Sequence, residues 1–237
     1  MNRTFFNSIV FTLMVFSASL LGAAAASEED AADAPAVVNV YCYDSFSGEW
    51  GPGPMIAEAF TAETGIEVVF HAPGDAVTVL NQLVLEDGSA PADVLVGMDN
   101  SLLQRVLESN LLSAYESPAL AEVDPALIFD DSYHLLPYDH GHFAINYDSA
   151  VIADPPASLE DLTAPEYEGK LVLMDPRTST PGLGFLLWTV AAYGENWPAY
   201  WERLKPSILT VADGWSTGYA LFTAGEAPLV LSYGTSP

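Results

Sequence analysis

The stretch "IEVVFHAPGDAVTVLNQLVLEDG" (residues 66–88) contains the pattern that decides the fold. It begins with a short, β-rich apolar run and passes through a Pro-Gly turn. Apolar residues then recur at helical spacing, and Asp75 is placed to cap the predicted helix. A strand followed at once by a helix is half of a βαβ unit, and such units build parallel sheets with helices on their faces.

The same alternation continues on both sides of this stretch. Three strands each followed by a helix are predicted before residue 113, and a second group of strands and helices is predicted after residue 141. We therefore expect an α/β fold of two lobes with mostly parallel sheets. The predicted strands are residues 37–43, 66–72, 92–98, 142–148, 170–176, 207–213 and 227–234, and the predicted helices are 54–65, 75–88, 100–112, 181–194, 198–205 and 214–225, with a short helix within 156–163.

Composition divides the chain into four parts. Residues 1–26 combine Arg3 with an apolar run and a small-residue end, which is typical of a secretory signal peptide. Residues 27–36 are predicted to be a disordered acidic leader, followed by the first lobe (37–139) and the second lobe (140–237). The single cysteine, Cys42, excludes an internal disulfide and is expected to be a buried strand thiol.

The chain is strongly acidic, with 32 Asp and Glu residues against 6 Lys and Arg residues and a formal net charge of −26. This balance excludes nucleic acid as a partner, because phosphate binding needs cationic side chains. It favours a cationic ligand, although acidity that serves only solubility is an open alternative.

Several loops that follow predicted strands contain aromatic residues. In open α/β sheets ligands bind outside the carboxyl ends of the strands, so these loops are candidates for a binding cleft. Tyr43 and Trp50 share one such loop with Asp44, a combination that suits a flat cation. Trp50 packing on the prolines of its own loop is the alternative. Trp215 and Tyr233 also come directly after strands.

The stretch "DPRTSTPGLGFLLW" (residues 175–188) opens a helix with three hydroxyl residues. Pro181 fits the first helical position, and Ser179 or Thr180 can cap the helix. The free N–H groups at this end, with the hydroxyls, can also hold an anion. These residues alone leave two roles open for the hydroxyls, which are helix capping alone and contact with a ligand.

Two motifs suggest chemistry that the rest of the chain does not support. "GWSTG" (residues 214–218) matches the nucleophile elbow of serine esterases, but no His follows Ser216 in this chain. "DHGHF" places His140 and His142 on one side of a strand, but no third well-spaced ligand accompanies them. We expect neither a catalytic residue nor a metal site.

Four segments together resemble a known family. "YCYDSFSGEWGPGP", "DPRTSTPGLGFLLW", "GWSTGYALF" and "LVLSYGTSP", in this order, are similar to the periplasmic thiamine-binding proteins of ABC importers. The resemblance runs from about Val38 to the last residue. It implies the type II periplasmic-binding fold, with two α/β lobes hinged around a cleft, and no catalysis. Because the family continues beyond the segment that matches "SYGTSP", we expect a C-terminally truncated chain with an incomplete first lobe.

The resemblance also implies the site residues. Tyr43 and Trp50 should line the cleft, Trp215 should stack on the ligand, and Asp75 matches a contact residue that is followed by Gly in most of the family, where this chain has Ala76. Ser179 and Thr180 match residues that reach the phosphate end of thiamine phosphates. The expected ligand-binding set is Tyr43, Asp44, Trp50, Asp75, Ala76, Ser179, Thr180, Trp215, Tyr233, Gly234, Thr235 and Ser236.

The expected function follows from the same resemblance. A monomeric periplasmic protein would capture thiamine, with thiamine phosphates as further candidates, by lobe closure and deliver it to a membrane permease. The ligand is cargo, and no cofactor is expected. The alternatives are a related binding protein for polyamine or ferric ion, although the chain has none of the adjacent tyrosines usual at ferric sites, and a serine esterase based on "GWSTG".

Overall fold

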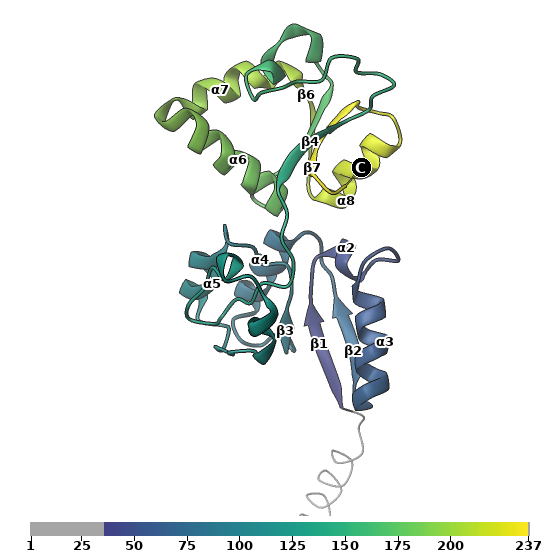
Figure 1. Cartoon of the computed structure of the whole chain (residues 1–237), viewed down its shortest axis with the longest axis vertical. Helices are drawn as coiled ribbons and strands as arrows, with labels where there is room; N and C mark the ends of the chain where they lie inside the picture. The colour runs from purple at the N-terminus through teal and green to yellow at the C-terminus, as the bar shows by residue number, and fades with distance from the viewer. Residues whose placement is uncertain (1–35, 237) are drawn as a thin grey trace, which may run out of the picture.

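The computed structural model describes residues 36–236, which form two α/β lobes, one around each of two sheets (Figure 1). The first lobe contains strands β1 to β3, and the second lobe contains β4 to β7. The predicted signal peptide and residues 27–35 of the predicted leader lie outside the described residues. The predicted boundary at residues 139 and 140 stays a prediction.

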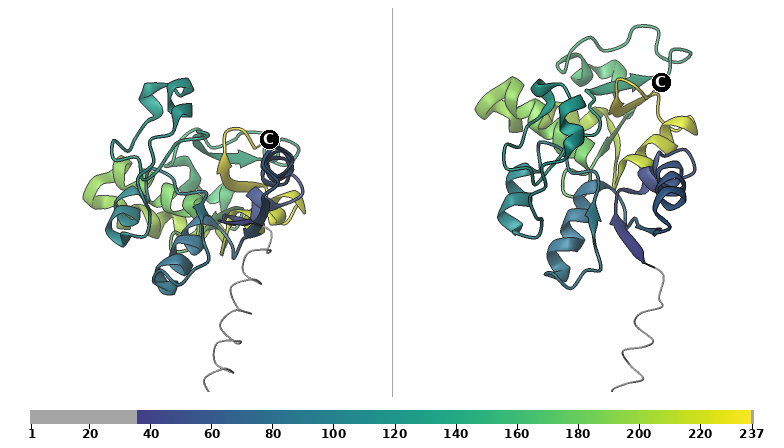
Figure 2. Two further views of the ribbon diagram at one scale, coloured as in Figure 1. Left: turned by 90° about the horizontal axis from the view of Figure 1, so that it is seen from below. Right: turned by 60° about the horizontal axis from the view of Figure 1, so that its bottom comes forward.

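The first sheet is parallel, with strand order β2-β1-β3. It confirms the pattern of strands and helices read from residues 37–112, with a shorter third strand and an additional short helix after the first strand. Figures 1 and 2 show α3 at one side of this sheet and α4 and α5 at the other. The elements are β1 (Val37–Tyr41), α2 (Asp44–Ser47), α3 (Gly53–Thr64), β2 (Glu67–His71), α4 (Ala76–Glu86), β3 (Val94–Leu95), α5 (Leu103–Ser109), and 3₁₀ turns η1 (Pro118–Glu122) and η2 (Pro125–Leu127).

The second sheet has strand order β4-β7-β5-β6. Its strands are parallel except β4, which pairs with β7 in the antiparallel sense, so the expectation of mostly parallel sheets is confirmed. The short helix predicted within residues 156–163 is only a 3₁₀ turn, η3. The elements are β4 (Phe143–Tyr147), η3 (Asp161–Thr163), η4 (Pro165–Tyr167), β5 (Leu171–Met174), α6 (Thr180–Tyr193), η5 (Gly194–Asn196), α7 (Trp197–Leu204), η6 (Lys205–Ser207), β6 (Ile208–Ala212), α8 (Trp215–Thr223) and β7 (Leu229–Tyr233).

The buried apolar residues form different clusters in the two lobes, and Leu183 of α6 packs against one of the first-lobe clusters. In the second lobe, α6 and α7 cover one side of the sheet and α8 the other, and β5 and β7 are buried between them (Figures 1 and 2). In the first lobe, one cluster surrounds Val40, Cys42 and Phe46, and another lies under α4 and α5. Cys42 is fully buried, as expected, and burial raises the pKa of its thiol.

The arrangement of the sheets places the strand ends where a ligand could bind. The arrows of β1 and β2 point toward the second lobe in Figure 1, so the loops that follow them lie between the lobes. The chain passes from the first sheet to the second between η2 and β4. Within residues 36–236, no helix combines the length and apolar character that a membrane crossing requires.

Candidate functional site

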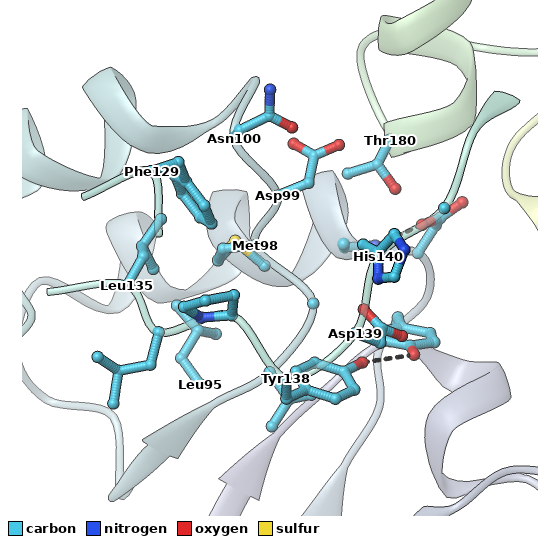
Figure 3. Close-up of a pocket in the computed structure, with 18 of the residues that line it drawn as sticks. Leu95, Met98, Asp99, Asn100, Phe129, Leu135, Tyr138, Asp139, His140 and Thr180 are labelled. Carbon is cyan, nitrogen blue, oxygen red and sulfur yellow. Dashed lines mark hydrogen bonds between the residues drawn. The ribbon is translucent and has the colours of Figure 1, made fainter. Parts of the chain in front are cut away.

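A cavity of about 1290 Å³ lies between the lobes. The loops after β1, β2 and β3 line it from the first lobe, and the starts of α6 and α8 and the end of β7 line it from the second. Figure 3 shows apolar side chains, among them Met98, Phe129 and Leu135, in one part of the cavity and polar side chains, among them Asp99, Asp139 and Thr180, in another.

Two tyrosines form the aromatic wall of the first lobe. The Tyr43 hydroxyl is hydrogen-bonded to the Tyr138 hydroxyl at 2.9 Å (Figure 3). This bond joins the loop after β1 to residues 128–142, the crossing segment between the two sheets. Gly97 lies beneath the Tyr43 ring, where an added Cβ would stand 2.4 Å from Cδ1. Its φ of 106° is also a conformation that favours glycine. Burial raises the pKa of Tyr43 and of Tyr138.

Trp215 and Tyr233 form the aromatic wall of the second lobe. The Trp215 indole N–H donates to Ser232 Oγ at 2.8 Å, and its ring stacks on Tyr219 with a centroid distance of 4.8 Å. The Tyr233 ring packs against Phe143 at 5.2 Å, and burial raises the pKa of its hydroxyl. These contacts hold both rings in place before any ligand arrives, which lowers the entropy cost of binding.

The cavity wall is rich in carboxylates. It contains three histidines but, among the described lining residues, no Lys or Arg, and its carboxylates are those of Asp44, Asp75, Asp93, Asp99 and Asp139. Burial raises the pKa of the Asp99 and Asp139 carboxyls. Arg177 comes three residues before the lining residue Thr180 in the sequence. Its side chain is 86% exposed and forms an ion pair with Asp175. The electrostatic potential of this wall therefore favours a cation.

The start of α6 combines capping with exposure to the cavity. Ser179 is fully buried and its hydroxyl accepts from the backbone N–H of Gly182 at 3.5 Å, so this side chain caps the helix. Thr180, the next residue, lines the cavity (Figure 3). Ser179 is therefore the capping hydroxyl and Thr180 the one that lines the cavity, while ligand contact by Thr180 stays a prediction.

The structure brings most of the predicted site residues to the cavity wall. Trp50, in the loop after α2, is not among the lining residues and is 95% exposed. Ser236 instead bonds to Ser232 behind the wall, with Oγ atoms 2.7 Å apart. The lining residues are Tyr43, Asp44, Asp75, Ala76, Thr180, Trp215, Tyr233 and Thr235, and those outside the wall are Trp50, Ser179, Gly234 and Ser236. Ligand contact by any of them stays a prediction.

Sequence reasoning missed part of the wall. Met98, Asp99 and Asn100 lie in the loop after β3, which the strand-end rule places at the cleft, but the predicted ligand-binding set names none of them. Tyr138 and His140 belong to the crossing segment, where strand periodicity carries no signal. Among residues 36–236 no group of three or more His, Cys, Asp or Glu side chains is arranged to hold a metal ion.

Comparisons with known proteins agree with this architecture. The sequence profile described as "Bacterial extracellular solute-binding protein" matches residues 89–207. The thiamine-binding periplasmic protein of Brucella abortus is 44% identical over 207 residues, which cover 87% of this chain and 61% of that protein. The protein of the same name from Escherichia coli is 42% identical over 201 residues, 85% of this chain and 61% of that protein.

Solved structures show the same fold. A periplasmic thiamin binding protein superposes with a TM-score of 0.80 at 41% identity, over 86% of this chain and 63% of that one. The iron-bound HitA of Pseudomonas aeruginosa superposes with a TM-score of 0.66 at 26% identity, over 84% and 63%. This chain spans about 61% of the length of the curated relatives named above. The type II periplasmic-binding fold is thereby confirmed, and the chain belongs to the bacterial extracellular solute-binding protein family.

Proposed function

We propose that this protein is a periplasmic binding protein that captures thiamine for an ABC importer. The observation that carries the proposal is the cavity wall, in which Tyr43, Trp215 and Tyr233 stand among carboxylates and no described lining residue is Lys or Arg. The thiamine-binding relatives, at 42 to 44% identity, support the same ligand.

The chemistry of thiamine matches this wall. Thiamine has a neutral aminopyrimidine ring, a cationic thiazolium ring and a hydroxyethyl tail. Flat rings gain dispersion energy on aromatic side chains, and a cation is attracted to both ring faces and carboxylates. The N–H groups and hydroxyl at the start of α6 would bind the polar tail, and thiamine phosphates are candidates there because helix N-termini attract anions.

The proposed mechanism is reversible lobe closure. Tyr43 belongs to the first lobe and Trp215 to the second, so a ligand held by both rings binds more tightly when the lobes approach each other. Only such differential affinity can shift the population toward the closed state. The closed, monomeric complex would then dock on a membrane permease. No covalent step is proposed, and a serine esterase has no support from the binding proteins that this chain resembles.

Ferric ion and polyamine are the weaker alternatives. Among the solved structures, the iron-bound HitA is 26% identical to this chain, whereas the thiamin binding protein is 41% identical. A putative spermidine/putrescine transporter from Listeria monocytogenes is 21% identical, a level at which only the fold is informative.

Calorimetry and tryptophan fluorescence with thiamine test the proposal. We expect thiamine to bind and to quench fluorescence, and Trp215→Ala to remove most of the quenching and to weaken affinity by about tenfold or more, as the loss of an aromatic stacking partner implies. Trp188→Ala, in a partly exposed residue of α6 outside the cavity wall, is the matched control and should bind like the unmodified protein. Binding of spermidine or ferric citrate without binding of thiamine would overturn the proposal.

A further inference from the structure

The motif "GWSTG" (residues 214–218) has a structural role that the proposed function does not use. It forms the first turn of α8 and lies where the second lobe meets the loops of the first lobe. Two carboxylates from different first-lobe loops reach this one turn.

The first carboxylate is that of Asp75, which also begins α4. Asp75 Oδ1 accepts from the backbone N–H of Ala76, and Oδ2 accepts from the backbone N–H of Trp215 at 3.0 Å. The residue is only 8% exposed. Gly214, at the N-cap position of α8, has no side chain with which to satisfy a free N–H group of the helix. A first-lobe side chain therefore supplies a cap to a second-lobe helix.

The second carboxylate is that of Asp44. The Ser216 hydroxyl donates to Asp44 Oδ1 at 2.9 Å, and the same oxygen accepts from the backbone N–H of Ser45 at 2.7 Å. A negative group at a helix N-terminus is favoured by the helix dipole, and a hydrogen bond to a charged acceptor is stronger than one between neutral groups. Ser216 thus donates a hydrogen bond across the lobes, and it is not among the cavity-lining residues.

Gly214 leaves room for the close approach of the lobes. A Cβ added to Gly214 would stand 3.2 Å from Asp75 Cβ, tighter than an ordinary van der Waals contact. Three further bonds join the lobes nearby. The backbone N–H and the hydroxyl of Thr78 donate to Thr178 O at 3.1 and 3.3 Å, and Asn81 Nδ2 donates to Arg177 O at 3.3 Å. These contacts all connect α4 or the start of α2 to the loop after β5 or to the first turn of α8.

We propose that Asp44 and Asp75, together with the first turn of α8, form a latch that holds the lobes together and positions Trp215 at the cavity. Because each bond of the latch joins two protein groups, the latch needs no ligand and sets how much of the free protein is already closed. Pre-closure raises apparent affinity, because a ligand then selects a state that is already populated. Ser216 is a positioning residue that acts through Asp44, and the proposal does not depend on which ligand the cavity binds.

The test measures the distance between the lobes in the ligand-free full chain. Spin labels are attached to cysteines introduced at Glu58 on α3 and Thr223 on α8, both exposed, whereas the native Cys42 is buried. Ser216→Asp places a second negative charge against Asp44 and should shift the distance distribution to longer values. Ser216→Ala should raise the ratio of open to closed protein about two- to tenfold, the effect of losing one hydrogen bond.

Thr217→Ala is the matched control, since Thr217 is the next residue of the same helix turn and is exposed. It should leave the distances unchanged. Adding Asp44→Asn to Ser216→Ala should produce little further opening if the two groups act on each other. Unchanged distances in both Ser216 variants, or equal opening in Thr217→Ala, would overturn the latch. A failure of thiamine binding would not affect this readout.

Discussion

The two sheets of this protein differ in how completely they are buried. In the second lobe, Leu171, Val172 and Leu231 are fully buried, because helices cover both faces of their sheet. In the first lobe, no residue of β2 is fully buried, and Val94 on β3 is 44% exposed. Burial of apolar area is the dominant favourable term in folding, so the second lobe has the larger stabilising core. The first lobe has smaller apolar clusters, and local polar hydrogen bonds and contacts with the second lobe add to its stability.

The largest expected effect comes from truncating a core side chain in the sheet of the second lobe, which is the more completely buried of the two. Leu231→Ala on β7 should destabilise the protein by about 3 kcal/mol, because a fully buried Leu loses both transfer energy and packing. Val68→Ala on β2, where the side chain is only partly buried, should cost about 1 kcal/mol. Urea unfolding of both variants measures the difference. Equal losses would mean that the difference in burial between the sheets has no energetic consequence.

An intermediate effect is expected at a polar anchor of the first lobe. Asp130 is 4% exposed, and its carboxylate accepts from the backbone N–H groups of Ser132, His134 and Leu135. Burial by itself would raise the pKa of Asp130, but these bonds and the Ser132 hydroxyl lower it from 3.8 to about 2. We expect Asp130→Asn to cost roughly 1 to 2 kcal/mol at neutral pH.

The sign of the pH dependence follows from the lowered pKa. Because the unfolded chain takes up the proton at higher pH than the folded one, the stabilisation is complete above the ordinary pKa of 3.8 and is lost as pH falls toward about 2. Stability curves of the unmodified protein and Asp130→Asn should therefore converge between these pH values. Curves that stay parallel would show that this carboxylate does not anchor the lobe electrostatically.

The smallest expected effect is that of replacing Trp50, which follows a first-lobe strand as Trp215 follows a second-lobe strand. Trp50→Ala should change stability by less than about 0.5 kcal/mol and thiamine affinity by less than about twofold, because a side chain that is 95% exposed has little contact to lose. Calorimetry checks this directly, with Trp215→Ala as the positive comparison. A large loss of affinity would show that the Trp50 loop folds over the cavity when ligand binds.

The order of strands and helices could be predicted from the sequence, because apolar periodicity reports local structure. The run at residues 66–72 and the capped helix from Asp75 are found as β2 and α4. Tyr43, Trp215 and Tyr233 could also be placed near a cleft, since side chains after the ends of parallel strands gather at one edge of a sheet.

Contacts between distant residues were decided by the tertiary structure alone. The direction of the Trp50 loop, the Tyr43–Tyr138 hydroxyl pair and the Asp44–Ser216 bond join groups that no periodic pattern relates. The tertiary structure also decided that Ser179 caps α6 whereas Thr180 lines the cavity. The sequence by itself determined which elements form and where polar and aromatic groups stand along the chain. Which of these groups meet depended on how the two sheets pack, because local propensity contains no information about partners far away in the chain.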